Sequence, residues 1–478
     1  MTRLAPVAAV AADGDLYRAA PKIYPREQDG RFQRLRHTAV VVLLGLYYVM
    51  PWLTWNGRQA VLFDLPARRF YILGLTFWPQ DFFYLTWLLI LAGLSLFFFT
   101  ALAGRLWCGY ACPQTVWTEV FLWMERWTEG DRNKRMKLDA APWSAEKLAR
   151  KGGKQALWIT FALWTGFTFV GFFTPIRELG PRVLTFTIGP WETFWTLFYS
   201  VATYGNAGYL REQVCKYMCP YARFQGAMFD PNTLVIAYDP ARGEPRGSRR
   251  RGTDYKAAGL GDCIDCTLCV QVCPTGIDIR DGLQYECIAC GACIDACDAV
   301  MDKVAYPRGL VRYATEESLA GHASHILRPR VIVYGLLLAA GFGAFGWSVT
   351  HRVPLIVDVV RDRNALYRVA SDGAIENAYT LKIMNKVDVA RSFVIMLEEE
   401  REGSEEEEEG EDDTSVTIAG GSPLEVTVQP GEVLAVPVTL RAAAGHIHGR
   451  GDVEFIVEAK DEPGVHYEAE SRFFGPAR

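Results

Sequence analysis

Long apolar stretches interrupt the polar N-terminal two-thirds of the chain. They cover Thr38–Trp55, Phe82–Ala103, Ala156–Pro175, Trp191–Leu210 and Val331–Trp347. Each is close to the roughly 20 residues that a helix needs to cross the hydrocarbon core of a bilayer. The fourth stretch contains Glu192 and several polar residues, so we expect it to pack inside a bundle. The pattern predicts an integral membrane α-helical bundle of about five transmembrane helices.

The pattern changes beyond the fifth stretch, where short runs alternate or are rich in β-branched residues. Turn signals such as Gln429-Pro430-Gly431 and Asp461-Glu462-Pro463-Gly464 separate these runs. Several short strands at this spacing predict an all-β sandwich of immunoglobulin-like type. The expected strands include Leu355–Val360, Tyr379–Met384, Ser392–Leu397, Leu424–Val428, Val433–Leu440 and Asp452–Ala459.

Basic residues predict the orientation of the helices. The N-terminal arm 1–36 has seven Lys and Arg residues and segment 105–154 has ten, whereas segments 56–81 and 174–190 have three and two. Since Lys and Arg concentrate in cytoplasmic loops, the N-terminus and the segment between the fourth and fifth helices are expected in the cytoplasm. The C-terminus is then expected on the outer side of the membrane.

One local acidic run accounts for the negative net charge of −5. Residues 398–413 carry twelve acidic side chains and one Arg, and a solvated loop at a hairpin tip is the expected structure. Metal capture by this run is a lesser alternative, as is a copper role for His446 and His448. The basic residues follow membrane topology, so nothing indicates nucleic-acid binding.

Eight of the twelve cysteines form two similar runs. The first is Cys263-x2-Cys266-x2-Cys269-x3-Cys273-Pro274, and the second is Cys287-x2-Cys290-x2-Cys293-x3-Cys297. Bacterial-type ferredoxins hold two 4Fe–4S clusters with this spacing, and the fourth cysteine of each run ligates the other cluster. One cluster is therefore predicted on Cys263, Cys266, Cys269 and Cys297, and the other on Cys287, Cys290, Cys293 and Cys273.

Structural zinc is the alternative for these eight thiols. Zinc sites usually close with two CxxC knuckles or with histidine, and neither run contains a histidine. The duplicated spacing therefore favours clusters, and with them electron transfer in a ferredoxin-like α+β module. Cluster thiolates must stay reduced, which agrees with the cytoplasmic side predicted from charge.

The other four cysteines form two pairs that share the pattern Cys-x-Tyr-x-Cys-Pro. Cys108 and Cys112 make the first pair, and Cys215 and Cys219 make the second. On one helix, residues four apart share a face, so each pair is expected to present two sulfurs to one ion. Proline after the second cysteine predicts the first turn of a new helix, where a thiol pKa is expected to be lowered.

Soft thiolates, with Met218 close by in sequence, would select Cu(I) over hard cations. The alternative is a pair of buried, inert cysteines at the membrane ends. The duplication favours a metal or redox role without identifying the metal.

Four segments together resemble one family. CGYACPQTVW, CKYMCPYARFQGAMFD, CIDCTLCVQVCPTGIDIRDGLQYECIACGACIDACD and VMDKVAYPRGLVRY are similar to the cytochrome c oxidase accessory protein CcoG family, also called FixG or RdxA. The resemblance covers about residues 25–400 and, weakly, the C-terminal sandwich. It implies a membrane cupric reductase that converts Cu(II) to Cu(I) during assembly of a cbb-type cytochrome c oxidase. Asp298 after Cys297 and the polyglutamate run depart from the expected pattern.

The resemblance also implies roles and partners. The eight ferredoxin cysteines would hold two 4Fe–4S clusters, and Cys108, Cys112, Cys215 and Cys219 would bind or reduce copper. The implied partners are the oxidase or its copper chaperones and a cytosolic electron donor. Two other functions stay open: a quinol dehydrogenase-type polyferredoxin subunit, and a non-enzymatic oxidase-assembly scaffold.

The predicted domain plan has five parts. It comprises a cytoplasmic arm (1–36), a four-helix membrane region with both CxxxCP motifs (37–220), a cytoplasmic dicluster ferredoxin-like domain (221–330), a fifth transmembrane helix (331–350) and a periplasmic immunoglobulin-like domain (351–478).

Overall fold

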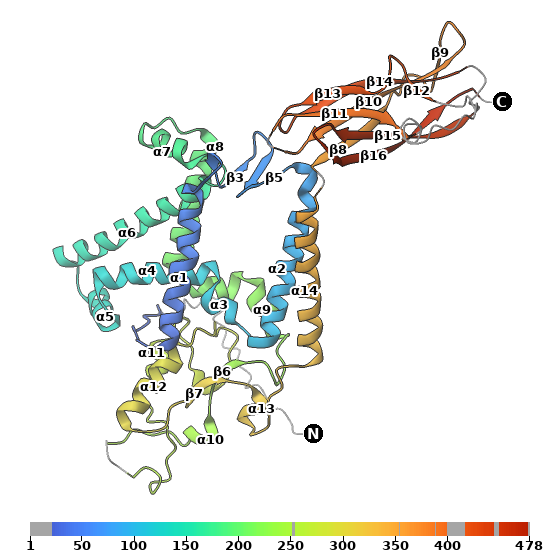
Figure 1. The fold of residues 1–478 in the computed structure, drawn as a ribbon. Helices are drawn as coiled ribbons and strands as arrows, with labels where there is room; N and C mark the ends of the chain where they lie inside the picture. Colours follow the sequence, from blue (N-terminus) through green and yellow to red (C-terminus); the bar gives the residue numbers. More distant parts are fainter. Residues whose placement is uncertain are drawn as a thin grey trace, which may run out of the picture. The chain divides into compact units, whose positions relative to one another are not determined.

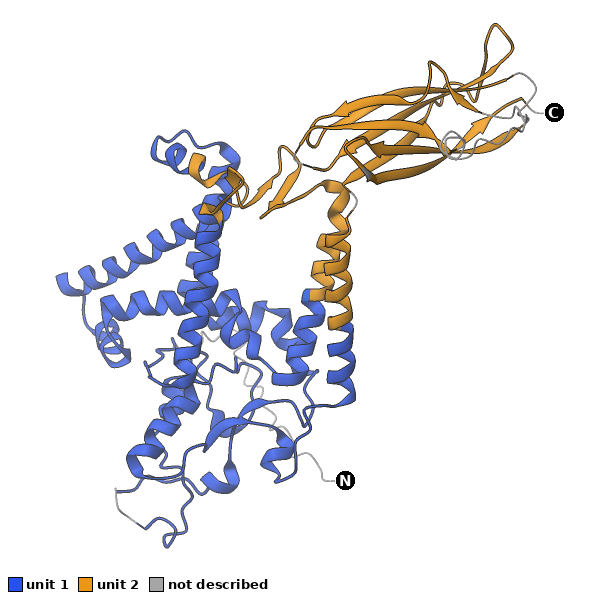
Figure 2. Ribbon diagram, in the orientation of Figure 1, with its two compact units in different colours: residues 1–50, 92–171, 179–337 blue, residues 51–91, 172–178, 338–478 orange. Residues whose placement is uncertain are grey.

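The structure is a computed structural model that describes residues 22–250, 254–352, 354–387, 389–398, 416–443 and 449–476. It divides into two compact units, coloured separately in Figure 2. Unit 1 comprises residues 1–50, 92–171 and 179–337, and unit 2 comprises residues 51–91, 172–178 and 338–478. Most of the predicted acidic loop, together with His446 and His448, lies outside the described residues.

Unit 1 holds most of the helices, which Figure 1 labels along the chain. Helices α2 (Phe82–Ala103), α7 (Ile176–Leu184) and α14 (Pro329–Thr350) each cross the boundary between the units. The other helices of its N-terminal part are α1 (Arg31–Val49), α3 (Leu106–Tyr110), α4 (Pro113–Glu129), α5 (Arg132–Ala140), α6 (Ala145–Val170), α8 (Pro190–Thr203), the π-helices η3 (Tyr204–Leu210) and η4 (Val214–Met218), and α9 (Pro220–Gly226).

Three segments of the described chain are long and apolar enough to cross a membrane. They are Arg31–Trp52, Pro79–Ala103 and Pro329–Thr350, and little of their surface is buried within the protein. Exposed apolar helices of this length indicate a membrane protein, and they confirm the first, second and fifth predicted spans. The third and fourth stay predictions, because α6 carries four basic residues in its first ten positions and α8 has only 14 residues.

The ferredoxin-like module forms the second part of unit 1. Strand β6 (Val235–Tyr238) pairs with the antiparallel strand β7 (Val311–Ala314), although 72 residues separate the end of one from the start of the other. Short helices carry the chain between them, as Figure 1 shows. These are α10 (Pro240–Gly243), α11 (Leu268–Gln271), η5 (Ile279–Asp281) and α12 (Ala292–Val304), and α13 (Glu316–Leu319) follows β7.

Unit 2 contains a two-sheet sandwich, which confirms the predicted immunoglobulin-like architecture. One sheet has the order β12-β14-β10-β8 with β9 beside β10, and the other has the order β13-β11-β15-β16. The strands are β8 (Leu355–Arg361), β9 (Arg368–Val369), β10 (Ile375–Asn385), β11 (Arg391–Leu397), β12 (Thr417–Ile418), β13 (Leu424–Val428), β14 (Val433–Ala442), β15 (Arg450–Ala459) and β16 (Glu462–Phe474).

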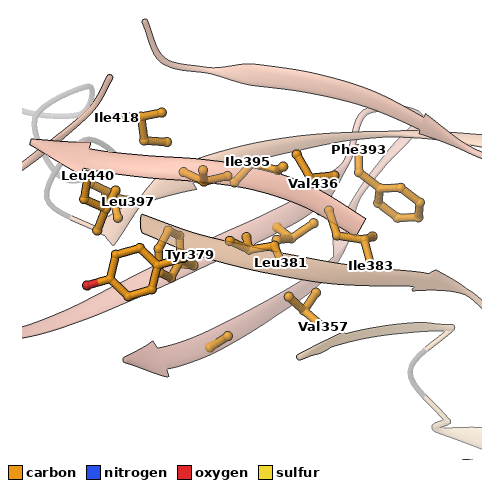
Figure 3. Packing of buried hydrophobic residues seen from close by; sticks show 14 of the residues in the cluster. Val357, Tyr379, Leu381, Ile383, Phe393, Ile395, Leu397, Ile418, Val436 and Leu440 are labelled. Atoms are coloured by element: carbon orange, nitrogen blue, oxygen red, sulfur yellow. The ribbon is translucent and has the colours of Figure 1, made fainter. Parts of the chain in front are cut away.

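Alternate residues of each strand fill the space between the two sheets. On β10, Tyr379, Leu381 and Ile383 point inward and are at most 2% exposed, and Figure 3 shows them facing Phe393 and Ile395 of the opposite sheet. This two-residue period is the one the sequence predicted.

Several strands were missed by the sequence reading. The segment between the first two spans folds into a hairpin of β1 (Thr54–Trp55) and β2 (Arg58–Gln59) and a sheet of β3 (Val61–Asp64), β4 (Arg69–Ile72) and β5 (Leu75–Phe77). Runs of two to four residues are too short to show a period. Strand β16 was also missed, and it begins at Glu462, within the turn predicted over Asp461-Glu462-Pro463-Gly464.

Candidate redox site

The first predicted thiol set surrounds one cavity of the ferredoxin-like module. Cys263, Cys266, Cys269 and Cys297 all line a cavity of about 380 Å³, together with Arg280. Cys266 is exposed, whereas Cys263 and Cys269 are buried. This cavity is therefore the one with a thiol at the protein surface.

The second predicted set surrounds a neighbouring cavity of about 330 Å³. Cys273, Cys287, Cys290 and Cys293 line it, and Cys269 borders both cavities. Cys297 of the second run thus lines the cavity of the first loop, and Cys273 of the first run lines the cavity of the second loop. Each cavity is therefore lined by the four thiols that the spacing assigns to one cluster, and the ligation itself stays a prediction.

The two cysteine loops have matching backbones. Asp265 and Thr267 in the first loop have φ angles of +53° and +56°, and Ala289 and Gly291 at the equivalent positions have +53° and +77°. Left-handed residues at both positions make the backbone of each CxxCxxC segment turn sharply, and the three thiols of the segment line one cavity. The left-handed conformation is unfavourable for side chains other than glycine, so a repeated pair of such residues indicates a backbone shaped for a ligand.

The arrangement fits a cluster better than a single ion. Among the residues that the structure describes, no three His, Cys, Asp or Glu side chains converge closely enough to hold one metal ion. In a 4Fe–4S cube each of four thiolates binds a different iron atom, so the sulfurs must surround a cavity instead of meeting at a point. Two cavities, each lined by one predicted set of four thiols, satisfy that requirement.

Burial raises the pKa of five of these thiols, those of Cys269, Cys287, Cys290, Cys293 and Cys297. It raises the pKa of Cys269 to about 11 and the pKa values of Cys287 and Cys297 to about 12. Burial thus favours the protonated form of these five thiols, and a metal group that binds them has to displace their protons.

The CxxxCP cysteines do not share a helix face, contrary to the prediction. Cys108 lies within α3, but Cys112 has extended backbone angles and is the N-cap of α4. The second copy repeats this arrangement, with Cys215 in η4 and Cys219 as the N-cap of α9. The proline after each second cysteine starts the new helix, as predicted, and the chain turns between the two thiols of a pair.

The pKa of Cys112 also departs from the prediction. Burial raises it, and hydrogen bonds from the backbone N–H groups of Thr115 and Gln114 oppose that rise without reversing it. A helix N-terminus lowers the pKa of a thiol and burial raises it, and at Cys112 the effect of burial is the larger one.

The four CxxxCP thiols lie in one neighbourhood of unit 1. Burial raises the pKa of Cys108 to about 12, and negative charge on Cys112, Cys215 or Cys219 would raise it further. The pKa of Cys215 rises to about 11, first through burial and then through Cys112 and Cys219. Such mutual effects require the thiols to be close together, although no three of them form a preformed ion site in the described chain.

The first CxxxCP copy contacts the second cysteine loop directly. A Cβ atom on Gly109 would lie 2.7 Å from the carbonyl oxygen of Ile288, so only glycine allows this approach. Tyr110 donates its hydroxyl to the Cys290 carbonyl at 3.3 Å, and Arg105 donates to the Cys287 carbonyl at the same distance. The loop that carries Cys287 and Cys290 is thus held against the chain that carries Cys108.

Glutamine side chains connect the two CxxxCP copies. Gly104 and Arg211 stand four residues before Cys108 and Cys215, and both are left-handed, with φ angles of +54° and +41°. The Gly104 carbonyl accepts a hydrogen bond from Gln225 of α9 at 3.1 Å, and the Arg211 carbonyl accepts one from Gln114 of α4 at 3.0 Å. Each copy therefore closes the helix end that precedes the other.

Helix α1 is anchored on the cluster module. The Asp295 carboxylate, on α12 between Cys293 and Cys297, accepts hydrogen bonds from the backbone N–H groups of Phe32 and Gln33 at 3.2 and 2.8 Å. A carboxylate at the first turn satisfies free N–H groups and favours the positive end of the helix dipole. One turn later, Arg36 forms a buried ion pair with Glu119 at 2.8 Å.

The supporting residues Arg105, Gly109, Gln225 and Asp295 were missed by the sequence reading. The duplicated motif did contain one signal that the two copies differ. Tyr110 and Tyr217 occupy the same position of the motif, but the position before them is Gly109 in the first copy and Lys216 in the second. Nothing in the pattern indicated which residues lie against the cysteine loop, since those contacts join segments about 180 residues apart.

Family models match three parts of the chain. A 4Fe-4S dicluster domain matches residues 210–316, a 4Fe-4S binding domain matches residues 84–134, and the IG-like fold at the C-terminal of FixG matches residues 345–476. The second match includes Cys108 and Cys112 but none of the eight ferredoxin cysteines. The cysteine modules are thus similar to iron–sulfur domains.

Curated relatives match most of the chain. The nitrogen fixation protein FixG of Rhizobium meliloti is 39% identical over 80% of this chain and 80% of its own length. Proteins RdxB and RdxA of Cereibacter sphaeroides are each 40% identical, over 90% and 80% of this chain and 91% and 83% of their own lengths.

A solved structure, that of a FixG-related protein from Vibrio parahaemolyticus, shares 33% identity and covers 25% of this chain and 95% of its own, with a TM-score of 0.20. The extent and identity of the matches to the three curated relatives show that the chain belongs to the FixG/RdxA/RdxB family.

Proposed function

We propose that this protein is a membrane-bound iron–sulfur oxidoreductase that reduces Cu(II) to Cu(I) during assembly of a cbb-type cytochrome c oxidase. One observation carries the proposal: the Cys108 segment packs directly on the loop that holds Cys287 and Cys290, through Gly109, Tyr110 and Arg105. A path for electrons needs such contact between the donor loop and the acceptor thiols.

The two cavities of the ferredoxin-like module would hold two 4Fe–4S clusters. Cys263, Cys266, Cys269 and Cys297 would ligate the first, and Cys273, Cys287, Cys290 and Cys293 would ligate the second. Clusters of this kind supply one-electron transfer, which matches the one-electron difference between Cu(II) and Cu(I).

Copper is the substrate, and the four CxxxCP cysteines would bind it. Thiolates are soft ligands that favour Cu(I) over Cu(II) and over hard cations. We propose that each pair, Cys108 with Cys112 and Cys215 with Cys219, offers two sulfurs, since no three thiols of the described chain converge on one point. Binding that favours Cu(I) would pull the reduction forward.

The protein would lie in the bacterial inner membrane with its N-terminus and clusters in the cytoplasm and its C-terminal sandwich in the periplasm. The exposure of Cys266 supports the first cavity as the side that would meet a cytosolic electron donor. The immunoglobulin-like domain would then face the oxidase or its copper chaperones.

Metal counting tests this proposal. The full-length protein, purified without oxygen, should contain about eight iron atoms, four for each cluster. Replacing Cys108, Cys112, Cys215 and Cys219 together with serine should abolish copper reduction and leave the iron content unchanged. About twelve iron atoms in the native protein, falling to eight in this variant, would show instead that these thiols hold iron. The match of residues 84–134 to a 4Fe-4S binding domain would then indicate a third cluster.

A further inference from the structure

Building on the proposed copper reduction, we propose that the two CxxxCP pairs perform different steps. Cys108 and Cys112 form the electron-receiving pair, next to the second cysteine loop. Cys215 and Cys219 form the copper-capturing pair, which flanks the exposed side chains of Tyr217 and Met218. The two copies have the same motif, but the structure places them differently.

The middle residues of the first copy are used for packing against the cysteine loop. Gly109 has no room for a side chain beside Ile288 and Ala289, and the hydroxyl of Tyr110 is engaged by the Cys290 carbonyl. Cys108 itself packs in the small hydrophobic cluster that includes Ile288 and Cys290. These contacts place Cys108 of the first pair against the loop that lines the second cavity.

The middle residues of the second copy are more exposed. Lys216 stands where the first copy has Gly109, so a matching approach to a cysteine loop is sterically excluded. Tyr217 and Met218 are 66% and 61% exposed. The Met218 thioether is a soft ligand that suits copper, and it is presented on the outside of the protein, next to Cys219.

A pocket also borders Cys215 of the second pair. Cys215 lines it together with Gln114, Arg211 and Glu212, and with Thr275 and Ile288 of the cluster module. An ion that arrives at Cys215 would thus lie in a pocket that the second cysteine loop also lines. The first pair has no comparable opening among the described cavities, because Cys108 lines none of those found.

The proposed step has a simple balance. One Cu(II) gains one electron and becomes Cu(I), while a reduced 4Fe–4S group loses one electron, and no proton or leaving group is transferred. A one-electron reductant must then restore the protein. Dithionite takes this role in the experiment.

The division of roles predicts opposite effects of two substitutions. Gly109→Ala should lower the rate constant for oxidation of the pre-reduced protein at saturating Cu(II) about tenfold, as changes next to a metal site commonly do, with Cu(I) affinity unchanged. Met218→Ala should weaken Cu(I) affinity about tenfold and raise the half-saturating Cu(II) concentration more than it lowers the limiting rate. Stopped-flow absorbance gives the rates, and competition with a chromogenic Cu(I) chelator gives the affinities without turnover.

The equivalent tyrosines supply a milder, matched pair. Tyr110→Phe removes one hydroxyl from the contact with the Cys290 carbonyl and should slow the oxidation, whereas Tyr217→Phe changes an exposed side chain and should not. If the Gly109→Ala variant loses iron, the two Tyr→Phe variants test whether contact with the cysteine loop sets the oxidation rate.

The outcomes separate the two proposals. If the native protein neither binds nor reduces copper, the proposed function is wrong. If it reduces copper but substitutions in the two copies change rate and affinity alike, the division between the pairs is wrong while the function stands.

Discussion

The side-chain amide of Gln225 joins the two CxxxCP copies, because its oxygen lies 3.7 Å from the sulfur of Cys108 while its nitrogen donates to the Gly104 carbonyl at 3.1 Å. Gln225 follows the second copy on α9, has no exposed surface, and also donates to the hydroxyl of Tyr221. A residue of the second copy therefore positions the thiol of the first, which makes the two copies a single structural unit.

Gln225→Leu tests this link. The substitution leaves the buried Gly104 carbonyl without its donor, which should lower the free energy of unfolding by about 1–3 kcal/mol. It also removes the acceptor for the Cys108 thiol, so alkylation of Cys108 in the copper-free protein should become faster. Thermal unfolding in detergent and mass spectrometry of iodoacetamide-treated protein measure the two effects.

Gln114→Leu is the matched control. Gln114 donates to the Arg211 and Asn206 carbonyls in the other copy, so its loss should cost similar stability without changing the alkylation of Cys108. Equal alkylation of Cys108 in both variants would mean that Gln225 acts on stability alone.

The crossed thiol sets predict which cysteines depend on one another. Cys263→Ser and Cys297→Ser, which are far apart in sequence but line one cavity, should each perturb the same cluster. Cys273→Ser should instead perturb the cluster that Cys290→Ser perturbs. Electron paramagnetic resonance of the dithionite-reduced variants checks this grouping. A grouping by sequence run, with Cys273 joined to Cys263, would contradict it.

The buried ion pair of Glu119 and Arg36 should stabilise the junction between α1 and α4. Burial raises the pKa of Glu119, but Arg36, His37 and Arg126 outweigh that effect and hold the pKa at about 2. Glu119→Gln leaves Arg36 buried without its partner and should cost about 3–5 kcal/mol of unfolding free energy. The exposed pair of Glu146 and Arg150 gives the control Glu146→Gln, which should cost below about 1 kcal/mol.

The same pair predicts a pH dependence. A carboxylate whose pKa falls from 4.5 to about 2 on folding contributes its full stability above pH 4.5 and loses it as the pH drops through 2. The difference in unfolding temperature between the native protein and Glu119→Gln should therefore be largest near neutral pH and shrink toward pH 2. A constant difference across this range would show that folding does not lower the pKa of Glu119.

A second buried ion pair lies within unit 2. Lys386 donates to the Asp81 carboxylate at 2.6 Å, and their side chains are 5% and 3% exposed. Lys386→Met should cost about 3 kcal/mol, because the buried Asp81 carboxylate then keeps the more distant Arg352 at 3.4 Å as its cationic partner, beside the Trp78 backbone N–H. Lys460→Met breaks an exposed pair with Glu425 and should cost below about 1 kcal/mol. Thermal unfolding in detergent compares the two variants, and equal costs would contradict the stabilising role of the buried pair.

Features repeated along the chain could be read from the sequence. The spacing of the eight ferredoxin cysteines predicted both sets of thiols, because a cluster of fixed size needs ligands at fixed intervals. The two-residue period of β10 and β14 predicted the sandwich, and unbroken apolar runs predicted α1, α2 and α14. In each case the determining interactions are local or periodic.

Features that join distant segments could not be read in this way. The contacts of Tyr110 with Cys290 and of Gln225 with Cys108 depend on the tertiary fold, which brings distant segments together. A single glutamine in the sequence does not indicate such a contact. The thiol pairs were misplaced on helix faces because Pro113 and Pro220 begin new helices, so the chain changes direction between the two cysteines of each pair. The pKa prediction for Cys112 was wrong because burial cannot be judged from a helix terminus alone.

The most direct test of the account mixes the dithionite-reduced, full-length protein with one equivalent of Cu(II) without oxygen and follows it by rapid-freeze electron paramagnetic resonance. We predict that the signals of the reduced clusters and of Cu(II) decay together, one for one, and that Cu(I) remains bound. The variant with serine at Cys108, Cys112, Cys215 and Cys219 should keep its cluster signal while Cu(II) stays unreduced. Equally fast decay in this variant, or a Cu(II) signal that persists beside reduced clusters in the native protein, would contradict copper reduction at the paired thiols.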